Sequence, residues 1–282
     1  MKFEKIGQPV RRLEDGRLLT GRGRFSDDWS LKNQAYMAVV RSPHAHARIR
    51  SVDTSDAENL PGVMAIFTGQ DCIADELSPI PHSPEPSTKY DMKLHGPGGS
   101  DVFIGNHMLL PADKARYVGE ALVVVVAETL AQAQDGADAV FIDFDPLPSV
   151  TDTKLSAEVG APVIWDEVPD NIPVETFFGD KEQTDAAFDA AAHVVEMEFH
   201  IDRVTGVPME PRAALGDYDA DTGRYTIYAG SGGSVRQKRE IAEVLGEEAY
   251  SVRVVSKDVG GNFGTRNRLY VEFPLVGWAS KK

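Results

Sequence analysis

The chain has 282 residues, of which 42% are hydrophobic and 26% are charged, and its formal net charge is −15. This length and composition are typical of one large or two ordinary globular domains with a real hydrophobic core, and they exclude a disordered chain. The acidic balance argues against binding to a nucleic-acid backbone, which requires a basic face.

The first 25 residues are polar, with several arginines separated by glycines. Composition predicts equally an arm laid over neighbouring structure and a solvated tail. The segment lacks the apolar stretch of a secretory signal, and no apolar run reaches the roughly 18 residues of a membrane span. The single cysteine, Cys72, can form no internal disulfide, and its acidic neighbours would not stabilise a thiolate. We therefore expect a cytoplasmic protein with an unreactive cysteine.

Apolar and β-branched runs predict the strands of the first half, and "ALVVVVAET" (121–129) is the most buried of them. Two short helical patterns, at 55–63 and 129–140, interrupt these runs, which indicates mixed α/β packing. Residues 76–105 are dense in Pro, Gly and Ser and predict a long surface loop. The expected strands are 34–42, 47–55, 63–71, 121–129 and 140–150.

The second half begins with an alanine-rich helix that Thr184 can cap, followed by the strand "HVVEMEFHI" (193–201). Alternating residues around Asp-Thr-Gly predict a hairpin at 217–230. An amphipathic helix at 234–246 and a strand at 251–259 follow, and the last residues have apolar side chains at helical spacing. We expect one α/β domain at 1–150, a linker at 151–173 and a second domain at 174–282.

Few residues indicate chemistry by themselves. His44 and His46 lie two apart on one face of an expected strand, but no cysteine or close carboxylate completes a zinc site, which favours a structural pair. Glu210 and Arg212 flank a proline in an otherwise apolar region, which predicts an internal ion pair first and the wall of a site second. Two glycine-rich segments, "AGSGGSV" (229–235) and "VGGNFGTRN" (259–267), each follow a strand. Exposed amides at such turns bind anions well, so a cofactor cradle and a tight turn both remain open.

The order of segments resembles the molybdopterin-binding large subunit of the xanthine dehydrogenase and carbon monoxide dehydrogenase family. The matching pieces cover nearly the whole chain in the family's order. They are "IGQPVRRLEDGRLLTGRGRFSDD", "VVRSPHAHARIRSVDTSDAENLPGVMAIFTGQD", "VGEALVVVVAET", "FDPLPSVTD", "PMEPRAAL" and "VGGNFG". The resemblance implies an α+β architecture, with an a/b hammerhead domain and its N-terminal arm at 1–150. Residues 174–282 would begin a mixed α/β molybdopterin-binding domain.

The resemblance also implies which residues lie at the cofactor. A Gly-Gly-Gly-Phe-Gly turn of the family passes beside the molybdenum ligands, and the matching residues are Gly260, Gly261, Asn262, Phe263 and Gly264. Its glycines allow close approach, and its amides can donate hydrogen bonds to an oxo group or the pterin. Asn262 replaces the third glycine, and asparagine tolerates left-handed backbone angles better than most residues.

Two further positions depart from the family's pattern. Gly232 stands where many members have a glutamine that hydrogen-bonds a molybdenum oxygen, and Asn267 stands where purine-oxidising members often have a glutamate. The departures put purine-type and carbon monoxide-type sites in doubt. The family's glutamate base would lie beyond Lys282, so the chain has no expected catalytic or metal-ligating residue. We expect a fragment, a split gene product or a truncated frame that does not catalyse by itself.

The implied parent reaction is hydroxylation of an aldehyde, an N-heterocycle or carbon monoxide with oxygen from water. The implied cofactor is a molybdopterin-type group such as molybdopterin cytosine dinucleotide. Iron–sulfur and FAD groups would lie on partner subunits, and the remainder of the large subunit would be a further partner. A non-catalytic remnant or assembly module that keeps the hammerhead fold is the alternative.

Overall fold

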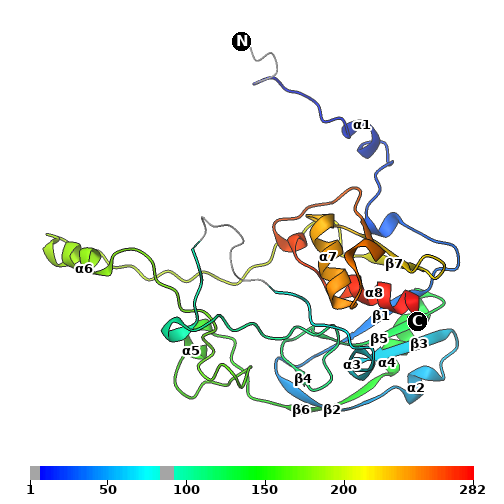
Figure 1. Ribbon diagram of the computed structural model, residues 1–282, viewed down its shortest axis with the longest axis horizontal. Helices are drawn as coiled ribbons and strands as arrows, with labels where there is room; N and C mark the ends of the chain where they lie inside the picture. Colours follow the sequence, from blue (N-terminus) through cyan, green and yellow to red (C-terminus); the bar gives the residue numbers. More distant parts are fainter. Residues whose placement is uncertain (1–6, 83–91) are drawn as a thin grey trace. The chain divides into compact units, whose positions relative to one another are not determined.

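The computed structural model describes residues 7–82 and 92–282 (Figure 1). The chain divides into two compact units. The continuous unit is Ala35–Thr205, and the split unit joins the residues up to Gln34 with Gly206–Lys282. The expected domain limits at 150 and 174 stay predictions, because these units record packing and not independent folding.

The continuous unit contains two three-stranded sheets, and all of their strand pairs are antiparallel. The first has β5 at its centre, and the second has β2 at its centre. The apolar runs of the sequence thus form the strands that they predict. In spatial order they are β1 (Tyr36–Arg41), β5 (Ala121–Ala127) and β3 (Val63–Thr68), then β4 (Lys114–Ala115), β2 (Ala47–Asp53) and β6 (Phe141–Pro146).

Strand β5 forms the core of this unit. Val123, Val124 and Val125 have no exposed surface, as expected for a central strand with both faces covered. Helix α4 (Leu130–Ala139) packs against β1 and β5 (Figure 1). A Cβ at Gly136 would lie 2.7 Å from Val125 Cγ1, so only glycine allows this close approach of helix and strand.

The other helices of the continuous unit are short. The sequence predicted a strand through residue 71, but the strand ends at Thr68, where Asp71 accepts hydrogen bonds from the Thr68 amide and hydroxyl and starts a helix. Within the expected loop at 76–105, residues 83–91 lie outside the described residues. The short helices are α2 (Ser55–Glu58), α3 (Gly69–Ala74), η2 (Pro97–Gly99) and α5 (Thr153–Ser156).

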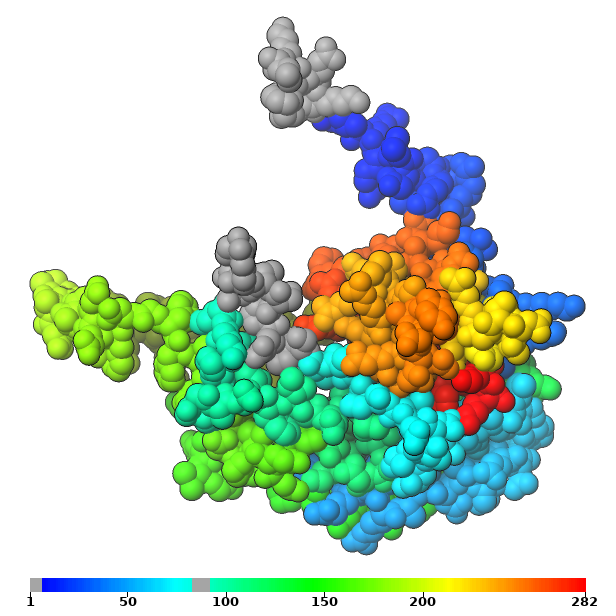
Figure 2. Space-filling model, viewed as in Figure 1, coloured from blue at the N-terminus to red at the C-terminus, as the bar shows by residue number. Residues whose placement is uncertain are grey.

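Helix α6 (Lys181–Ala190) has no buried residue, and its side chains are open to solvent (Figure 2). Asp180 caps it by accepting a hydrogen bond from the Gln183 amide, so the predicted cap at Thr184 is wrong. The predicted strand at 193–201 is also wrong, since the structure has no strand there and Phe199 is 75% exposed. Alternation supplies an apolar face, but a strand also needs a neighbour for its backbone hydrogen bonds.

The split unit has a three-stranded sheet in the order β7 (Ala214–Asp219), β8 (Arg224–Ala229) and β9 (Val252–Val255). Strands β7 and β8 form the predicted antiparallel hairpin, and β9 runs parallel to β8. Helix α7 (Ser234–Val244) supplies the crossover that a parallel pair requires. Helix α8 (Glu272–Lys281) packs on β7. The remaining elements are α1 (Asp15–Leu18), η1 (Ser26–Asp28), η3 (Ala249–Ser251) and η4 (Thr265–Asn267).

Across residues 7–82 and 92–282, no helix combines the length and the apolar character that crossing a membrane requires.

Candidate functional site

Both glycine-rich segments belong to the split unit. The first follows β8 and the second follows β9, and because these strands are parallel neighbours both segments leave the same edge of the sheet. The Gly232 amide donates to the Arg266 carbonyl at 2.9 Å, which joins the segments directly. The structure therefore brings together Gly232 and the turn 260–264 that the sequence analysis singled out.

The turn uses left-handed backbone angles at three residues. Gly261 has φ of 113°, Phe263 has φ of 50° and Gly264 has φ of 86°. Asn262 is not among the residues with positive φ, so the turn does not use the tolerance of asparagine for the left-handed conformation. Phe263 takes it instead, which is costly for an aromatic residue and recurs at functional sites. Its side chain is 76% exposed.

Asn262 shapes the turn through its side chain. Its Oδ1 accepts hydrogen bonds from the amides of Gly264 at 3.1 Å and Arg266 at 3.2 Å. Its carbonyl accepts from the Thr265 amide at 3.0 Å. By contrast, the amides of Gly261, Asn262 and Phe263 have no hydrogen-bond partner in the described part of the chain. Three consecutive free donors in a turn with positive φ values suit a ligand with anionic or oxygen acceptors.

The three departures from the family's pattern are in mutual contact. Asn262 Nδ2 donates to Asn267 Oδ1 at 2.8 Å. A Cβ at Gly232 would lie 2.1 Å from Asn267 Oδ1 and 2.4 Å from Asn262 Nδ2. The paired amides thus fill the space into which a larger residue at 232 would project. Sequence reasoning found these positions one by one but gave no signal that they touch.

A buried ion pair lies at the base of the turn. Glu210 Oε2 is 3.0 Å from Arg266 Nη1, and the two side chains are 7% and 5% exposed. The same carboxylate accepts hydrogen bonds from the Gly260 amide at 2.8 Å and from the Ser26 amide and hydroxyl at 3.0 and 2.7 Å. Burial raises the pKa of Glu210, but the hydrogen bonds from Ser26 and Gly260 and the charge of Arg266 together hold it below its usual value.

Glu210 and Arg212 each form an ion pair, as the sequence predicted, but they do not pair with each other. Arg212 pairs with Glu272 at 3.2 Å and its guanidinium lies 4.2 Å from the centre of the Tyr270 ring. The sequence analysis missed Arg266, which is 4% exposed. A charged residue two positions after a glycine turn was the available signal, because such a residue needs a partner when it is buried.

A second carboxylate, Asp258, lies just before the turn. Its carboxylate accepts hydrogen bonds from both terminal nitrogens of Arg17 and, at 2.7 Å, from the Arg24 amide. The hydrogen bond from Arg17 is the main reason that the pKa of Asp258 falls to about 2. Part of the N-terminal arm therefore packs against the Gly206–Lys282 portion of the split unit and is not a solvated tail.

The other sequence candidates do not form a site. His44 and His46 precede β2 and do not lie on a strand; His46 Nδ1 is 3.0 Å from the Pro148 carbonyl oxygen, as a structural role requires. Within the described residues, no group of three or more His, Cys, Asp or Glu could hold a metal ion. Cys72 is fully buried, and burial is the main cause that raises the pKa of its thiol to about 12, which agrees with the expected lack of reactivity.

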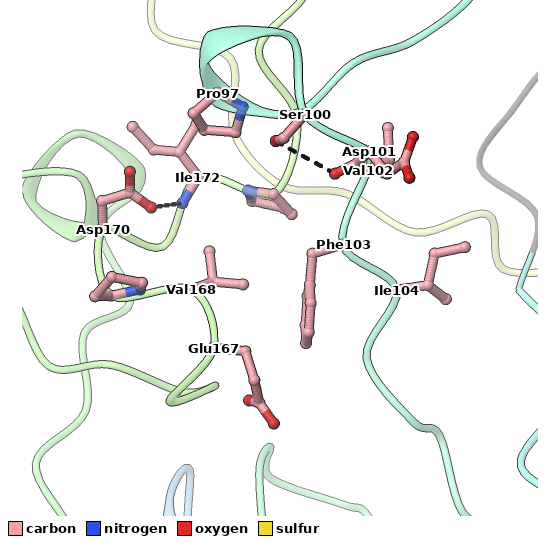
Figure 3. Close-up of a pocket in the computed structure, with 12 residues that line it drawn as sticks. Pro97, Ser100, Asp101, Val102, Phe103, Ile104, Glu167, Val168, Asp170 and Ile172 are labelled. Carbon is pink, nitrogen blue, oxygen red and sulfur yellow. Dashed lines mark hydrogen bonds between the residues drawn. The ribbon is translucent and has the colours of Figure 1, made fainter.

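A cavity of about 510 Å³ lies in the continuous unit (Figure 3). Phe103, Val168 and Ile172 contribute apolar side chains, and the acidic residues of the lining are Asp101, Glu167 and Asp170. None of the residues that the sequence analysis predicted for a site lines it.

Two family models match the chain in succession. The a/b hammerhead domain of aldehyde oxidase and xanthine dehydrogenase matches residues 20–148, and the molybdopterin cofactor-binding domain matches residues 164–282. The expected α+β fold class, with these two domains in this order, is confirmed.

The chain is similar over nearly its whole length to larger proteins. It is 36% identical to the nicotine 6-hydroxylase large subunit of Paenarthrobacter nicotinovorans, over 98% of this chain and 32% of that protein. It is 28% identical to the carbon monoxide dehydrogenase large chain of Afipia carboxidovorans, over 95% of this chain and 32% of that one. The crystal structure of quinoline 2-oxidoreductase from Pseudomonas putida 86 matches with a TM-score of 0.84 and 32% identity, covering 96% of this chain and 33% of that chain.

The chain thus spans about a third of the length of the relatives it matches. The two domain matches and the relatives agree on one family. The chain belongs to the xanthine dehydrogenase and carbon monoxide dehydrogenase family of molybdopterin-binding large subunits, and within it carries the a/b hammerhead and molybdopterin cofactor-binding regions.

Proposed function

We propose that this chain contributes the glycine turn 260–264 to the molybdopterin site of a molybdenum hydroxylase. The observation that carries the proposal is the run of three free amides at Gly261, Asn262 and Phe263, within a region that matches the molybdopterin cofactor-binding domain. A Cβ at Gly264 would meet no atom within 4 Å, so this part of the turn is open to a ligand. The residues present therefore fit the cofactor.

The chain's own groups have three roles in this proposal. The free amides donate hydrogen bonds to oxygen acceptors of the bound group. The exposed ring of Phe263 would pack against the bound group and exclude water from it. The Glu210–Arg266 pair holds the base of the turn, and its charges compensate each other there. The molybdenum cofactor, when bound, supplies the redox chemistry of a hydroxylation that uses oxygen from water.

An N-heterocycle is the substrate class that we favour. Nicotine and quinoline, named in two of the relatives, both contain an aromatic ring nitrogen. The neutral amides of Asn262 and Asn267 occupy the space where a glutamine at position 232 would extend, which supports a site unlike the purine or carbon monoxide types. Aldehydes remain within the proposed chemistry, and molybdopterin cytosine dinucleotide is the proposed form of the cofactor.

The proposed partners are an iron–sulfur subunit, an FAD subunit and further large-subunit sequence, in the cytoplasm. Several exposed apolar side chains support contacts with additional protein, because large apolar surfaces of this kind usually mark interaction sites. Those of the 195–201 segment are Val195, Met197, Phe199 and Ile201, which are 68–88% exposed.

A pair of matched glycine variants tests the cofactor role. Gly264 and Gly160 have φ of 86° and 85°, and a Cβ at either would meet nothing within 4 Å. Valine at either position should cause similar backbone strain, roughly 1–3 kcal/mol. In a polypeptide of the relatives' full length, only Gly264→Val should also lower molybdenum content, as measured by elemental analysis beside thermal stability. Full molybdenum content and normal turnover in Gly264→Val would show that this stretch is only a turn.

The 282-residue chain alone should not retain stoichiometric molybdenum. The chain spans about a third of its relatives, and we expect the remaining two thirds of the full-length protein to supply further cofactor contacts. Stoichiometric metal in the purified chain, again by elemental analysis, would contradict this expectation and would place the complete site within these residues.

A further inference from the structure

The N-terminal arm contacts the segment that leads into the glycine turn. Arg17 forms a two-bond ion pair with Asp258, whose side chain is 10% exposed. The backbones of Arg24 and Asp258 also meet, because the Asp258 amide donates to the Arg24 carbonyl at 3.0 Å. These contacts fix the chain two residues before Gly260.

The same arm reaches the turn by a second route. Ser26 donates two hydrogen bonds to Glu210, and the other oxygen of that carboxylate accepts from the Gly260 amide and pairs with Arg266. One carboxylate therefore connects the arm to Gly260, the first residue of the turn, and to Arg266, two residues after its end. Both carboxylate oxygens of Glu210 therefore accept hydrogen bonds.

The arm also contacts the sheet through stacked side chains of Arg24, Trp29 and Tyr228. The Arg24 guanidinium lies 4.3 Å from the centre of the Trp29 ring, and the Trp29 ring centre lies 4.6 Å from that of Tyr228 in β8. Such contacts give an extended segment a defined register on the surface beneath it.

We propose that residues 17–29 are a positioning strap for the glycine turn. Acting through Asp258 and Glu210, the strap fixes both ends of the turn, so that the amides between them stay free and in place for a ligand. The identity of that ligand rests on the proposed function, whereas the positioning of the turn does not. Arg17 and Ser26 are positioning residues, since they touch the turn only through the two carboxylates.

Hydrogen–deuterium exchange of the 282-residue chain tests the strap. In Arg17→Ala, the bonded amides of the 256–267 peptide should exchange at least about tenfold faster, while peptides from β8 and α7 keep their rates. Arg17→Lys keeps one charged hydrogen bond and should restore part of the protection. Arg12→Ala is the matched control, because Arg12 lies in the same arm and, among residues 7–82 and 92–282, forms an ion pair only with the nearby Asp15. It should leave the 256–267 peptide unchanged.

Two results would overturn the strap. One is a change below about twofold in the 256–267 peptide of Arg17→Ala; the other is an equal rise throughout Gly206–Lys282, which would mark a general stabilising contact. Molybdenum content of the full-length protein separates the strap from the proposed function. A loosened turn with unchanged molybdenum would uphold the strap and contradict the cofactor role of the turn.

Discussion

The two glycine-rich segments of the split unit have similar compositions but need glycine for different reasons. In the 229–235 segment, Gly230 and Gly232 leave room for side chains of the protein itself. In the 260–264 turn, Gly261 and Gly264 supply left-handed backbone angles. The first segment packs closely against side chains at Gly230 and Gly232. The second packs closely only at its start, where a Cβ at Gly260 would lie 2.4 Å from Glu210 Cβ, and it is open at Gly264. A high glycine content therefore predicts that other atoms come close to the backbone, but it does not tell whether those atoms belong to the protein or to a ligand.

The strongest way to break this comparison is Gly230→Ala. Its Cβ would lie 2.2 Å from Arg266 Nη1, and Arg266 cannot move aside without leaving Glu210 buried and unpaired. Loss of one partner of a buried ion pair costs about 3–5 kcal/mol. Urea denaturation followed by tryptophan fluorescence should show a loss of this size. A loss below about 1 kcal/mol would mean that the segment is not closed by Arg266.

Gly264→Ala should have a smaller effect, of about 1–2 kcal/mol, because the only penalty is a left-handed backbone angle in open space. The Glu210–Arg266 pair does not depend on this residue. Thermal unfolding of Gly264→Ala and of Gly160→Ala, whose glycine has φ of 85° in equally open space, measures this loss of stability. A much larger loss at Gly264 alone would reveal packing against the turn that the structure does not show.

Gly232→Ala should cost about 1 kcal/mol, the usual contribution of one hydrogen bond, because its Cβ displaces the Asn262–Asn267 amide pair. The cost should fall in a background in which Asn262 and Asn267 are both Gly, because that background removes both side chains that the Cβ would meet. A double-mutant cycle in urea measures this coupling. Equal costs in both backgrounds would show that the three positions are independent.

Gly233→Ala is expected to change stability by less than about 0.5 kcal/mol. Gly233 has an extended backbone with φ of −175°, and a Cβ there would meet nothing within 4 Å. It shares its segment with Gly230 but not its close contact. A loss comparable to that of Gly230→Ala would mean that the whole segment resists substitution and would remove the contrast between its glycines.

Sequence patterns predicted the elements that depend on residues close together in the chain. The β7–β8 hairpin follows from alternation around an Asp-Thr-Gly turn, and α7 follows from its apolar spacing and the glycine at its end. The location of the glycine turn was likewise visible from its residues. These features involve neighbours within about a dozen residues of one another.

Features set by distant residues could not be predicted in this way. The partner of Glu210 is Arg266, which lies 56 residues later and was not singled out. The 193–201 segment has the alternation of a strand but no neighbouring strand to complete its hydrogen bonds. Within the turn, Phe263 and not Asn262 takes a left-handed angle, and the Asn262 side chain accepts hydrogen bonds from the amides of Gly264 and Arg266.

The ion pair between Arg17 and Asp258 also sets an order of events during synthesis. The two residues are 241 positions apart, and the whole of Ala35–Thr205 is made between them. At about 5–20 residues per second, a ribosome needs roughly 12–48 s to add the partner after the arginine. Arg17 is therefore made before Ala35–Thr205 and can pair with Asp258 only after that unit has been synthesised.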